Sequence, residues 1–167
     1  MSRLAPYRLE LAAAAVVVVL DQATKAVVRG RLALHESVEV VGGVLDLTRV
    51  HNSGAAFGML NGVDFAMKPL VMGAVALVAM AGIVWYMGQL PREDRLARLG
   101  MAAIVGGAVG NLIDRVQYGY VLDFVDAYWA GWHFWAFNVA DAAITVGVGL
   151  IILDMLGLGR RRASNSV

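Results

Sequence analysis

Asp123 and Asp141 are the two residues of this sequence with the strongest case for catalytic chemistry. Each carboxylate follows apolar residues rather than lysines, and together they flank an aromatic segment between apolar runs. Ionisable groups are costly at membrane depth and usually mark a functional site there. Two aspartates in one dry site cannot both ionise easily, so we expect them to share a proton. One carboxylate can then take a proton from water while the other polarises a carbonyl group, which predicts hydrolysis without a covalent intermediate.

Several polar side chains are spaced to support this pair. Asn138 and Asp141 are three residues apart, so they share a face of the first turn of a helix. There the helix dipole is expected to make Asp141 the easier carboxylate to ionise. Asn111 and Arg115 lie one turn apart at the end of an earlier apolar run. We expect both asparagines to hydrogen-bond the carboxylates, and Arg115 to orient backbone carbonyls of a bound peptide.

Two earlier segments carry further polar groups. Asp21 and Lys25 follow an apolar run and are spaced to pair as i,i+4 neighbours on a helix. An interfacial ion pair that ends the helix explains them equally well. In the segment NSGAAF at 52–57, Asn52 offers side-chain hydrogen bonds and Gly54 allows a backbone conformation closed to other residues. A turn that returns the chain to the membrane explains this segment about as well.

The apolar runs that must position these groups predict membrane-spanning helices. The chain has 167 residues, which is room for one domain. It is 59% hydrophobic and 16% charged, with a mean hydropathy of +0.66, too apolar for an ordinary soluble domain. We therefore predict an α-helical integral membrane protein, with a single membrane-embedded domain over residues 1–167. Four transmembrane helices are predicted, at about 7–28, 69–88, 99–113 and 138–158.

The segments between these spans predict one small β element. Residues 38–50 place β-branched residues on either side of two glycines, which is a hairpin signal. An isolated hairpin is marginal in water, so we expect it in the outer loops, on the membrane surface or against other loops. Residues 114–137 are crowded with aromatic side chains, which we interpret mainly as a belt at the membrane interface. Gly106 and Gly110 have the GxxxG spacing that permits close helix packing.

The distribution of arginines predicts the orientation of the chain. Eight arginines fall on one side of the four predicted spans, whereas acidic residues dilute the basic residues of the loop 29–67 on the other side. This bias places both termini in the cytoplasm and the candidate site at the outer leaflet. The eight residues are Arg3, Arg8, Arg92, Arg95, Arg98, Arg160, Arg161 and Arg162.

Composition also excludes several classes of function. The net charge is +1, without the clustered basic surface of a nucleic-acid-binding protein. There are no cysteines, which excludes disulfides, thiolate metal sites and a cysteine nucleophile. The histidines His35, His51 and His133 have no HExxH or similar spacing, so we expect no metal site and no cofactor.

The residues alone leave two classes of function open. A membrane protease and a small proton-coupled transporter or channel both use intramembrane Asp and Arg residues. A transporter should show polar groups across the bilayer midplane or an internal repeat, and the uncharged run 70–88 shows neither. A carboxylate pair does not specify a reaction, so these observations do not separate the two. A non-catalytic scaffold would leave the clustered polar groups unexplained.

Five short blocks resemble the signature blocks of lipoprotein signal peptidases. They occur in the family's order from residue 20 to residue 141, so the resemblance covers nearly the whole chain. Each block alone is weak, but the combination is specific. The blocks are LDQATK (20–25), NSGAAF (52–57), NLIDR (111–115), VLDF (121–124) and FNVAD (137–141).

The resemblance implies an aspartic endopeptidase of the bacterial inner membrane in which Asp123 and Asp141 are catalytic. It further implies that Asn52 and Gly54 line the substrate cleft and that Asp21 supports the site. The implied reaction removes the signal peptide of a diacylglyceryl-modified prolipoprotein just before the lipidated cysteine. The expected partners are therefore such precursors and membrane lipids, with no nucleic acid, and the protein is expected to be a monomer.

Overall fold

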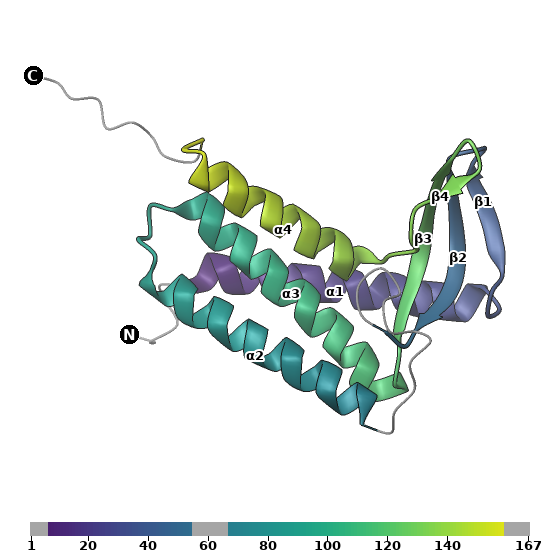
Figure 1. Cartoon of the computed structure of the whole chain (residues 1–167), viewed down its shortest axis with the longest axis horizontal. Helices are drawn as coiled ribbons and strands as arrows, with labels where there is room; N and C mark the ends of the chain where they lie inside the picture. Colours follow the sequence, from purple (N-terminus) through teal and green to yellow (C-terminus); the bar gives the residue numbers. More distant parts are fainter. Residues whose placement is uncertain (1–6, 55–66, 159–167) are drawn as a thin grey trace, which may run out of the picture.

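Four helices form a bundle, and a small sheet lies beyond one end of it (Figure 1). The computed structural model describes residues 7–54 and 67–158. Both ends of the described chain lie at the end of the bundle opposite the sheet (Figure 1). The helices are α1 (Arg8–Arg31), α2 (Lys68–Gln89), α3 (Arg95–Tyr118) and α4 (Val139–Met155).

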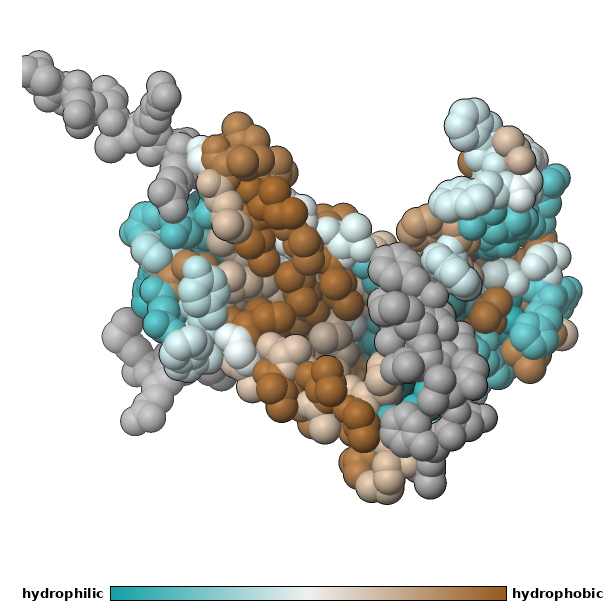
Figure 2. Space-filling model, viewed as in Figure 1, coloured by the Kyte–Doolittle hydropathy of each residue, from teal (hydrophilic) through white to brown (hydrophobic). Residues whose placement is uncertain are grey.

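Three of the described helices are long and apolar enough to cross a membrane. They are α1, α3 and the part of α2 from Leu70 to Gln89. Helix α4 is also apolar, but its 17 residues extend only ~25 Å at about 1.5 Å per residue. The fourth predicted span therefore stays a prediction. Figure 2 shows apolar surface along the helices, with polar residues gathered on the sheet and at the opposite end of the bundle.

Helices α1 and α3 extend further than the sequence predicts, whereas α4 ends at Met155 instead of near residue 158. Helix α1 continues past residue 28 to Arg31, and α3 has 24 residues instead of ending near residue 113. It ends where Gly119 adopts a left-handed φ of 80°, and the Gly119 N–H donates to the Arg115 carbonyl oxygen. The charged residues Asp114 and Arg115 do not end α3, because their side chains bind partners in other elements.

The sheet has four antiparallel strands in sequence order. The predicted hairpin is confirmed as β1 and β2, with Gly43 at a φ of 75° in the turn between them. The third and fourth strands were not predicted. The strands are β1 (Ser37–Val41), β2 (Leu45–Asn52), β3 (Val121–Trp129) and β4 (Trp132–His133).

Strand β3 lies in the segment interpreted from sequence as an aromatic belt. Leu122 and Phe124 of β3 are buried and form a small core with Val28 of α1, which fastens the sheet to the bundle. The belt interpretation is therefore wrong for Phe124, which is a core residue. Trp129 and Trp132, at the turn between β3 and β4, are 79% and 69% exposed, as a membrane-interface belt requires.

Glycines allow α3 to approach α1 closely. A Cβ atom on Gly106 would lie 2.8 Å from the carbonyl oxygen of Ala14, and one on Gly110 would lie 2.6 Å from Oδ2 of Asp21. Both distances are shorter than real Cβ contacts. The packing role predicted for this GxxxG spacing is confirmed.

A second set of glycines brings α3 against α4. A Cβ atom on Gly100 would lie 2.5 Å from the carbonyl oxygen of Gly147, and the reverse substitution meets the same clash. Gly107 faces the carbonyl oxygen of Ala140 in the same way. This close approach holds the end of α3 beside the start of α4, where the candidate site lies.

We expect Gly107→Ala to lower the free energy of unfolding by about 1–3 kcal/mol, because the new methyl group has to displace backbone atoms of α4. Gly82→Ala in α2 is the matched control, since nothing lies within 4 Å of its new methyl group. That control should be neutral or slightly stabilising. Thermal unfolding of both variants in detergent tests this, and equal melting temperatures would contradict the close α3–α4 contact.

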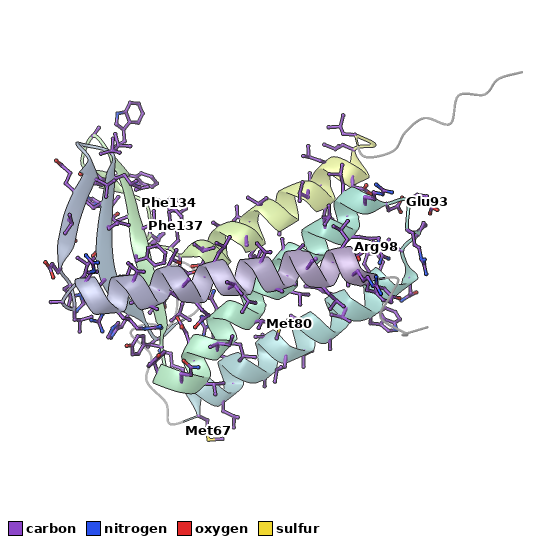
Figure 3. All side chains as sticks on the ribbon, turned by 180° about the vertical axis from the view of Figure 1, so that it is seen from behind. Met67, Met80, Glu93, Arg98, Phe134 and Phe137 are labelled. Atoms are coloured by element: carbon purple, nitrogen blue, oxygen red, sulfur yellow. The ribbon has the colours of Figure 1, made fainter. Side chains whose placement is uncertain are left out.

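Arg98 is one of the eight arginines on the predicted cytoplasmic side, but its charge is paired with that of Glu10. It lies at the end of the bundle away from the sheet (Figure 3), and its side chain is buried. Its Nε donates to Oε1 of Glu10 at 2.6 Å. Among the described arginines of this group, Arg8, Arg92 and Arg95 remain exposed, whereas Arg3 and Arg160–Arg162 lie outside the described residues.

Candidate active site

The structure brings together polar residues from β2, α3, β3 and α4. Asp123 lies in β3, and Asp141 lies in the first turn of α4. Asn52 ends β2, and Asn111 lies in the last half of α3. Antiparallel pairing places Asn52 close to Asp123, because Val50 is opposite Asp123 and Asn52 is opposite the residue two positions before it. The aromatic side chains of Phe134 and Phe137 lie between the sheet and the bundle beside this site (Figure 3).

Asp123 is buried and held by two asparagines. Asp123 is only 2% exposed to solvent. Asn52 Nδ2 donates to Oδ2 of Asp123 at 2.9 Å, and Asn138 Nδ2 donates to Oδ1 at 2.7 Å. Each carboxylate oxygen therefore has an amide donor. The hydrogen bond expected from Asn138 is confirmed.

Asp141 is fixed by α3 and by the start of its own helix. Asn111 Nδ2 donates to Oδ1 of Asp141 at 2.8 Å, as expected from the sequence. Asn138 and Asp141 form a capping box, in which the Asn138 side chain accepts from the Asp141 N–H and the Asp141 side chain accepts from the Asn138 N–H. The first turn of α4 therefore fixes the orientation of the Asp141 carboxylate.

The two asparagines connect the two carboxylates. Asn138 Nδ2 donates to Oδ1 of Asn111 at 3.2 Å, which joins Asp123, Asn138, Asn111 and Asp141 in one chain of hydrogen bonds. Lys25 Nζ also donates to Oδ1 of Asn111, at 3.0 Å. Because that oxygen accepts two hydrogen bonds, the Asn111 amide is oriented with its nitrogen toward Asp141.

A buried ion network lies behind this chain. Lys25 contacts Asp21 at 2.8 Å and Asp114 at 3.0 Å, and all three side chains are fully buried. Arg29 Nη2 contacts the other oxygen of Asp114 at 2.7 Å. The predicted Asp21–Lys25 pair is confirmed, and it is internal rather than interfacial.

This network reaches both carboxylates through the backbone. Asp21 Oδ1 accepts from the N–H of Ala140, the residue before Asp141, at 3.0 Å. Asp114 Oδ2 accepts from the N–H of Leu122, the residue before Asp123, at 3.0 Å. Sequence reasoning did not assign Lys25 or Asp114 to the site. The signal that could have found them is that each lies in one of the five signature blocks, within an otherwise apolar helix.

Arg115 positions the chain after β2. Its Nη2 donates to the carbonyl oxygen of Gly54 at 3.0 Å, and its Nη1 donates to the carbonyl oxygen of Asn111 at 3.3 Å. Gly54 in turn donates its N–H to Oδ1 of Asn52 at 2.9 Å. Arg115 therefore binds backbone carbonyls of its own chain, and its contact with a substrate peptide stays a prediction.

Burial changes the protonation of Asp123. Loss of water around its carboxylate, and secondly the negative charge of Asp141, raise the pKa of Asp123 to about 7. Hydrogen bonds from Asn52 and Asn138 favour the charged form and oppose this rise. Near neutral pH Asp123 is consequently poised between its protonated and ionised forms, as a group that exchanges a proton with substrate must be.

Both carboxylates open into an apolar cavity of about 710 Å³. This volume lies in the usual range of roughly 300–1,000 Å³ for ligand sites. Small side chains of α2 and α3 and apolar side chains of α4 form its walls. They include Ala76, Ala79, Ala108, Ile144 and Val146. The site therefore combines a polar end that contains two carboxylates with an apolar cavity.

Comparison with known proteins agrees with this arrangement. The family model described as "Signal peptidase (SPase) II" matches residues 13–157. The "Lipoprotein signal peptidase" of Geobacter metallireducens is 46% identical over 160 residues, covering 96% of this chain and 98% of the relative. That of Symbiobacterium thermophilum is 46% identical over 154 residues, covering 92% and 97%.

A solved structure also has the same fold. It is described as a bacterial membrane enzyme determined at 2.3 Å resolution by the in meso method, and it superposes with a TM-score of 0.81. Its sequence is 30% identical, with 95% of this chain and 94% of that chain covered. Of the two classes that the residues left open, the family match supports the protease rather than the transporter. The chain belongs to the signal peptidase II family.

Proposed function

We propose that this chain is an aspartic endopeptidase that removes the signal peptide from lipid-modified prolipoproteins, cutting just before the lipidated cysteine. The observation that carries the proposal is the pair of carboxylates, Asp123 and Asp141, joined through two asparagines at the polar end of an apolar cavity. The names of the curated relatives support the substrate class.

In the proposed mechanism the two carboxylates have different protonation states. Protonated Asp123 donates a hydrogen bond to the scissile carbonyl oxygen, while ionised Asp141 takes a proton from the attacking water. Asp141 is suited to the ionised role because it lies at a helix N-terminus and accepts from Asn111. The tetrahedral intermediate then collapses as the C–N bond breaks, and Asp141 passes the proton that it took from water to the leaving amine. No covalent enzyme intermediate, metal or cofactor takes part.

The cavity supports a lipid-linked substrate. Its walls are apolar, and alanines at 76, 79 and 108 leave room for an acyl chain or an apolar signal-peptide segment. A lipid on the cysteine would hold the scissile bond at the depth of the carboxylates. The roles proposed for Asn52 and Gly54 are to position Asp123 and the chain that borders the cleft.

We further propose that the protein is a monomer of the inner membrane, with α4 as a fourth span. Both termini would then be cytoplasmic, with the site at the outer leaflet. In support, both described ends of the chain lie at the bundle end opposite the sheet (Figure 1). The exposed residues Arg92 and Arg95 lie in or next to the loop at that same end.

The proposed function is tested by incubating the purified protein with a diacylglyceryl-modified precursor and with the same precursor lacking the lipid. We expect release of the signal peptide from the lipidated precursor, and a rate at least about a hundredfold lower without the lipid, because remote binding energy is used to position the scissile bond. Equal cleavage of both precursors would contradict a lipid-dependent site. A reaction abolished by a metal chelator would contradict the aspartic mechanism.

We expect the cleavage rate to fall as the pH rises above about 7, because Asp123 then loses the proton that it donates. The loss should approach tenfold per pH unit well above the pKa.

The free energy of unfolding should also depend on the protonation of Asp123. Its pKa is raised on folding, so the native state binds the proton more tightly, and the free energy of unfolding should decrease from about pH 4 to about pH 7.

Rates and urea midpoints measured from pH 4 to pH 9 test both effects. In Asp123→Asn the decrease in stability over that pH range should be smaller, since asparagine does not titrate. A cleavage rate that stays constant to pH 9 would contradict protonated Asp123 as the donor.

A further inference from the structure

A group of basic and aromatic side chains lies where α1, β2 and the end of α3 meet, and it takes no part in the proposed mechanism. Arg49 Nη1 donates to the carbonyl oxygens of Arg29 and Leu32 at 3.3 and 3.0 Å, which ties β2 to the last turn of α1. We call this group the basic cluster. It consists of Arg29, Arg49, His51, Tyr118 and Tyr120.

Stacked rings hold the basic cluster together. The guanidinium carbon of Arg29 lies 4.1 Å from the centre of the Tyr118 ring. The Tyr118 and Tyr120 ring centres are 6.0 Å apart, and Tyr120 stacks on His51 with ring centres 3.6 Å apart. The two ends of this stack are Arg29 of α1 and His51 of β2. Its geometry is therefore fixed by the fold rather than by one flexible segment.

Three buried nitrogen atoms of the basic cluster have no hydrogen-bond partner. Among the described residues only four buried side-chain polar atoms lack one, and three of them are Arg29 Nε, Arg49 Nε and His51 Nε2. A buried N–H group without a partner costs about 1–3 kcal/mol. An arginine Nε always carries a hydrogen and can only donate, so the missing partner has to be an acceptor.

The positive charge of Arg49 differs from the other charges near these nitrogens. Lys25 and Arg29 are balanced by the carboxylates of Asp21 and Asp114, which they contact. Arg49 has no carboxylate within ion-pair distance in the part of the chain that the structure describes. The neighbouring acid Glu36 accepts instead from the N–H of Ala33. An acceptor for the basic cluster would therefore be favoured if it were negatively charged.

The titration of His51 agrees with this surplus of positive charge. Burial lowers the pKa of His51, and the positive charge of Arg49 lowers it further. The surroundings of the imidazole thus disfavour one more cation.

The position of the basic cluster along α1 indicates which anion is available. Glu10, in the buried pair with Arg98, marks one end of the bundle, and Arg29 lies 19 residues later on the same helix. At about 1.5 Å per residue the two are ~28 Å apart, close to the ~30 Å thickness of the hydrocarbon layer. This spacing is compatible with a basic cluster at the depth of phospholipid headgroups and Glu10 near the opposite boundary of the hydrocarbon layer.

We propose that the basic cluster binds the phosphate group of an anionic phospholipid, in the leaflet that contains the candidate active site. Guanidinium groups match phosphate geometry well and are more weakly hydrated than ammonium groups. The bound headgroup would also restrain Arg29 and, through it, Asp114. Asp114 accepts from the N–H of Leu122, the residue before Asp123, so the position of Asp123 would be restrained as well. This proposal does not depend on the protease assignment, and its test reads lipid binding directly.

The test uses the delipidated full-length protein in a non-ionic detergent, titrated with phosphatidylglycerol and followed by native mass spectrometry. Phosphatidylcholine with the same acyl chains and inorganic phosphate are the comparison ligands. We expect one phosphatidylglycerol to bind at least about tenfold more tightly than phosphatidylcholine, because the choline cation of the latter is repelled by the positive charge of Arg49. Inorganic phosphate in millimolar excess should not displace it.

Two variants and one control assign the binding to the basic cluster. Arg49→Gln keeps an amide able to donate to the end of α1 and should weaken phosphatidylglycerol binding about tenfold. His51→Phe keeps the stack on Tyr120, removes Nε2, and should weaken binding by a smaller factor. Arg31→Gln removes an exposed charge from the same end of α1 and should leave binding within about twofold of wild type.

Three outcomes would overturn the proposal. One is wild-type lipid affinity in Arg49→Gln and His51→Phe, each shown to be folded by an unchanged melting temperature without lipid. Another is an equal loss in Arg31→Gln, which would assign binding to diffuse surface charge. The third is displacement by inorganic phosphate, which would make the ligand a free anion rather than a lipid.

Discussion

Replacing either aspartate of the pair with asparagine is expected to abolish nearly all precursor cleavage, with a loss of about 10³-fold or more in Asp123→Asn and in Asp141→Asn. Asparagine preserves the shape of each side chain and keeps one acceptor oxygen, so each variant retains one of the two hydrogen bonds that its carboxylate accepts. It cannot exchange a proton with water or with the leaving group. Substrate binding should remain, because the cavity walls are unchanged.

The double variant should be little worse than either single variant. Residues that act as one unit are not additive, since removing one of them already stops the proton transfer in which both take part. Multiplied losses would instead indicate two independent contributions, contrary to a shared proton. Single-turnover rates with saturating lipidated precursor separate this effect from substrate binding.

Asp126→Asn is the matched control. Asp126 is in the same strand as Asp123, but its carboxylate contacts His133 at 2.9 Å, away from the cavity. The variant should retain cleavage within a few-fold of wild type and retain its hydrogen bond with the imidazole. A comparable loss in Asp126→Asn would show that changes in β3, rather than loss of the carboxylate pair, stop the reaction.

Lys25→Met is expected to lower the free energy of unfolding by about 3–5 kcal/mol, the usual result of removing one partner of a buried ion pair. Methionine has a similar length and fills the same space. It leaves Asp21 and Asp114 facing each other in a fully buried position with only Arg29 as a cation. Asn111 also loses one of the two hydrogen bonds that orient its amide, and keeps the one from Asn138.

Thermal and denaturant unfolding in detergent measure this effect. Arg31→Met removes an exposed cation from the same helix and should change stability by no more than about 0.5 kcal/mol. An unchanged midpoint for Lys25→Met would contradict the network. The variant should also lose activity beyond its loss of folded protein, because Asn138 alone then orients the Asn111 amide.

The residues of the site were predictable from sequence to the extent that their spacing is local. Asn138 and Asp141 are three residues apart, so helix geometry alone places them on one face, where they form a capping box. The pairing of Asp21 with Lys25 follows from i,i+4 spacing in the same way. That both asparagines would reach carboxylates on other elements was inferred from residue type, and the structure confirms it.

Contacts between distant parts of the chain were not predictable in this way. Asp114 contacts Lys25, which lies 89 residues earlier in the chain, and no local sequence pattern specifies such a pair. Strand β3 was missed for a related reason. Its pattern has several aromatic residues, and it becomes a strand because β2 pairs with it and Leu122 packs on α1. The end of α3 was misplaced because tertiary partners of Asp114 and Arg115 permit charged residues to remain helical.

The most direct test of the whole account is the mass of the mature product. A lipidated precursor is cut by wild type, Asp123→Asn and Asp141→Asn under identical conditions, and the new N-terminus is identified by mass spectrometry. We expect a product that begins at the lipidated cysteine with wild type, and no such product with either variant. A product that begins elsewhere, or the same product at a wild-type rate from either variant, would contradict it.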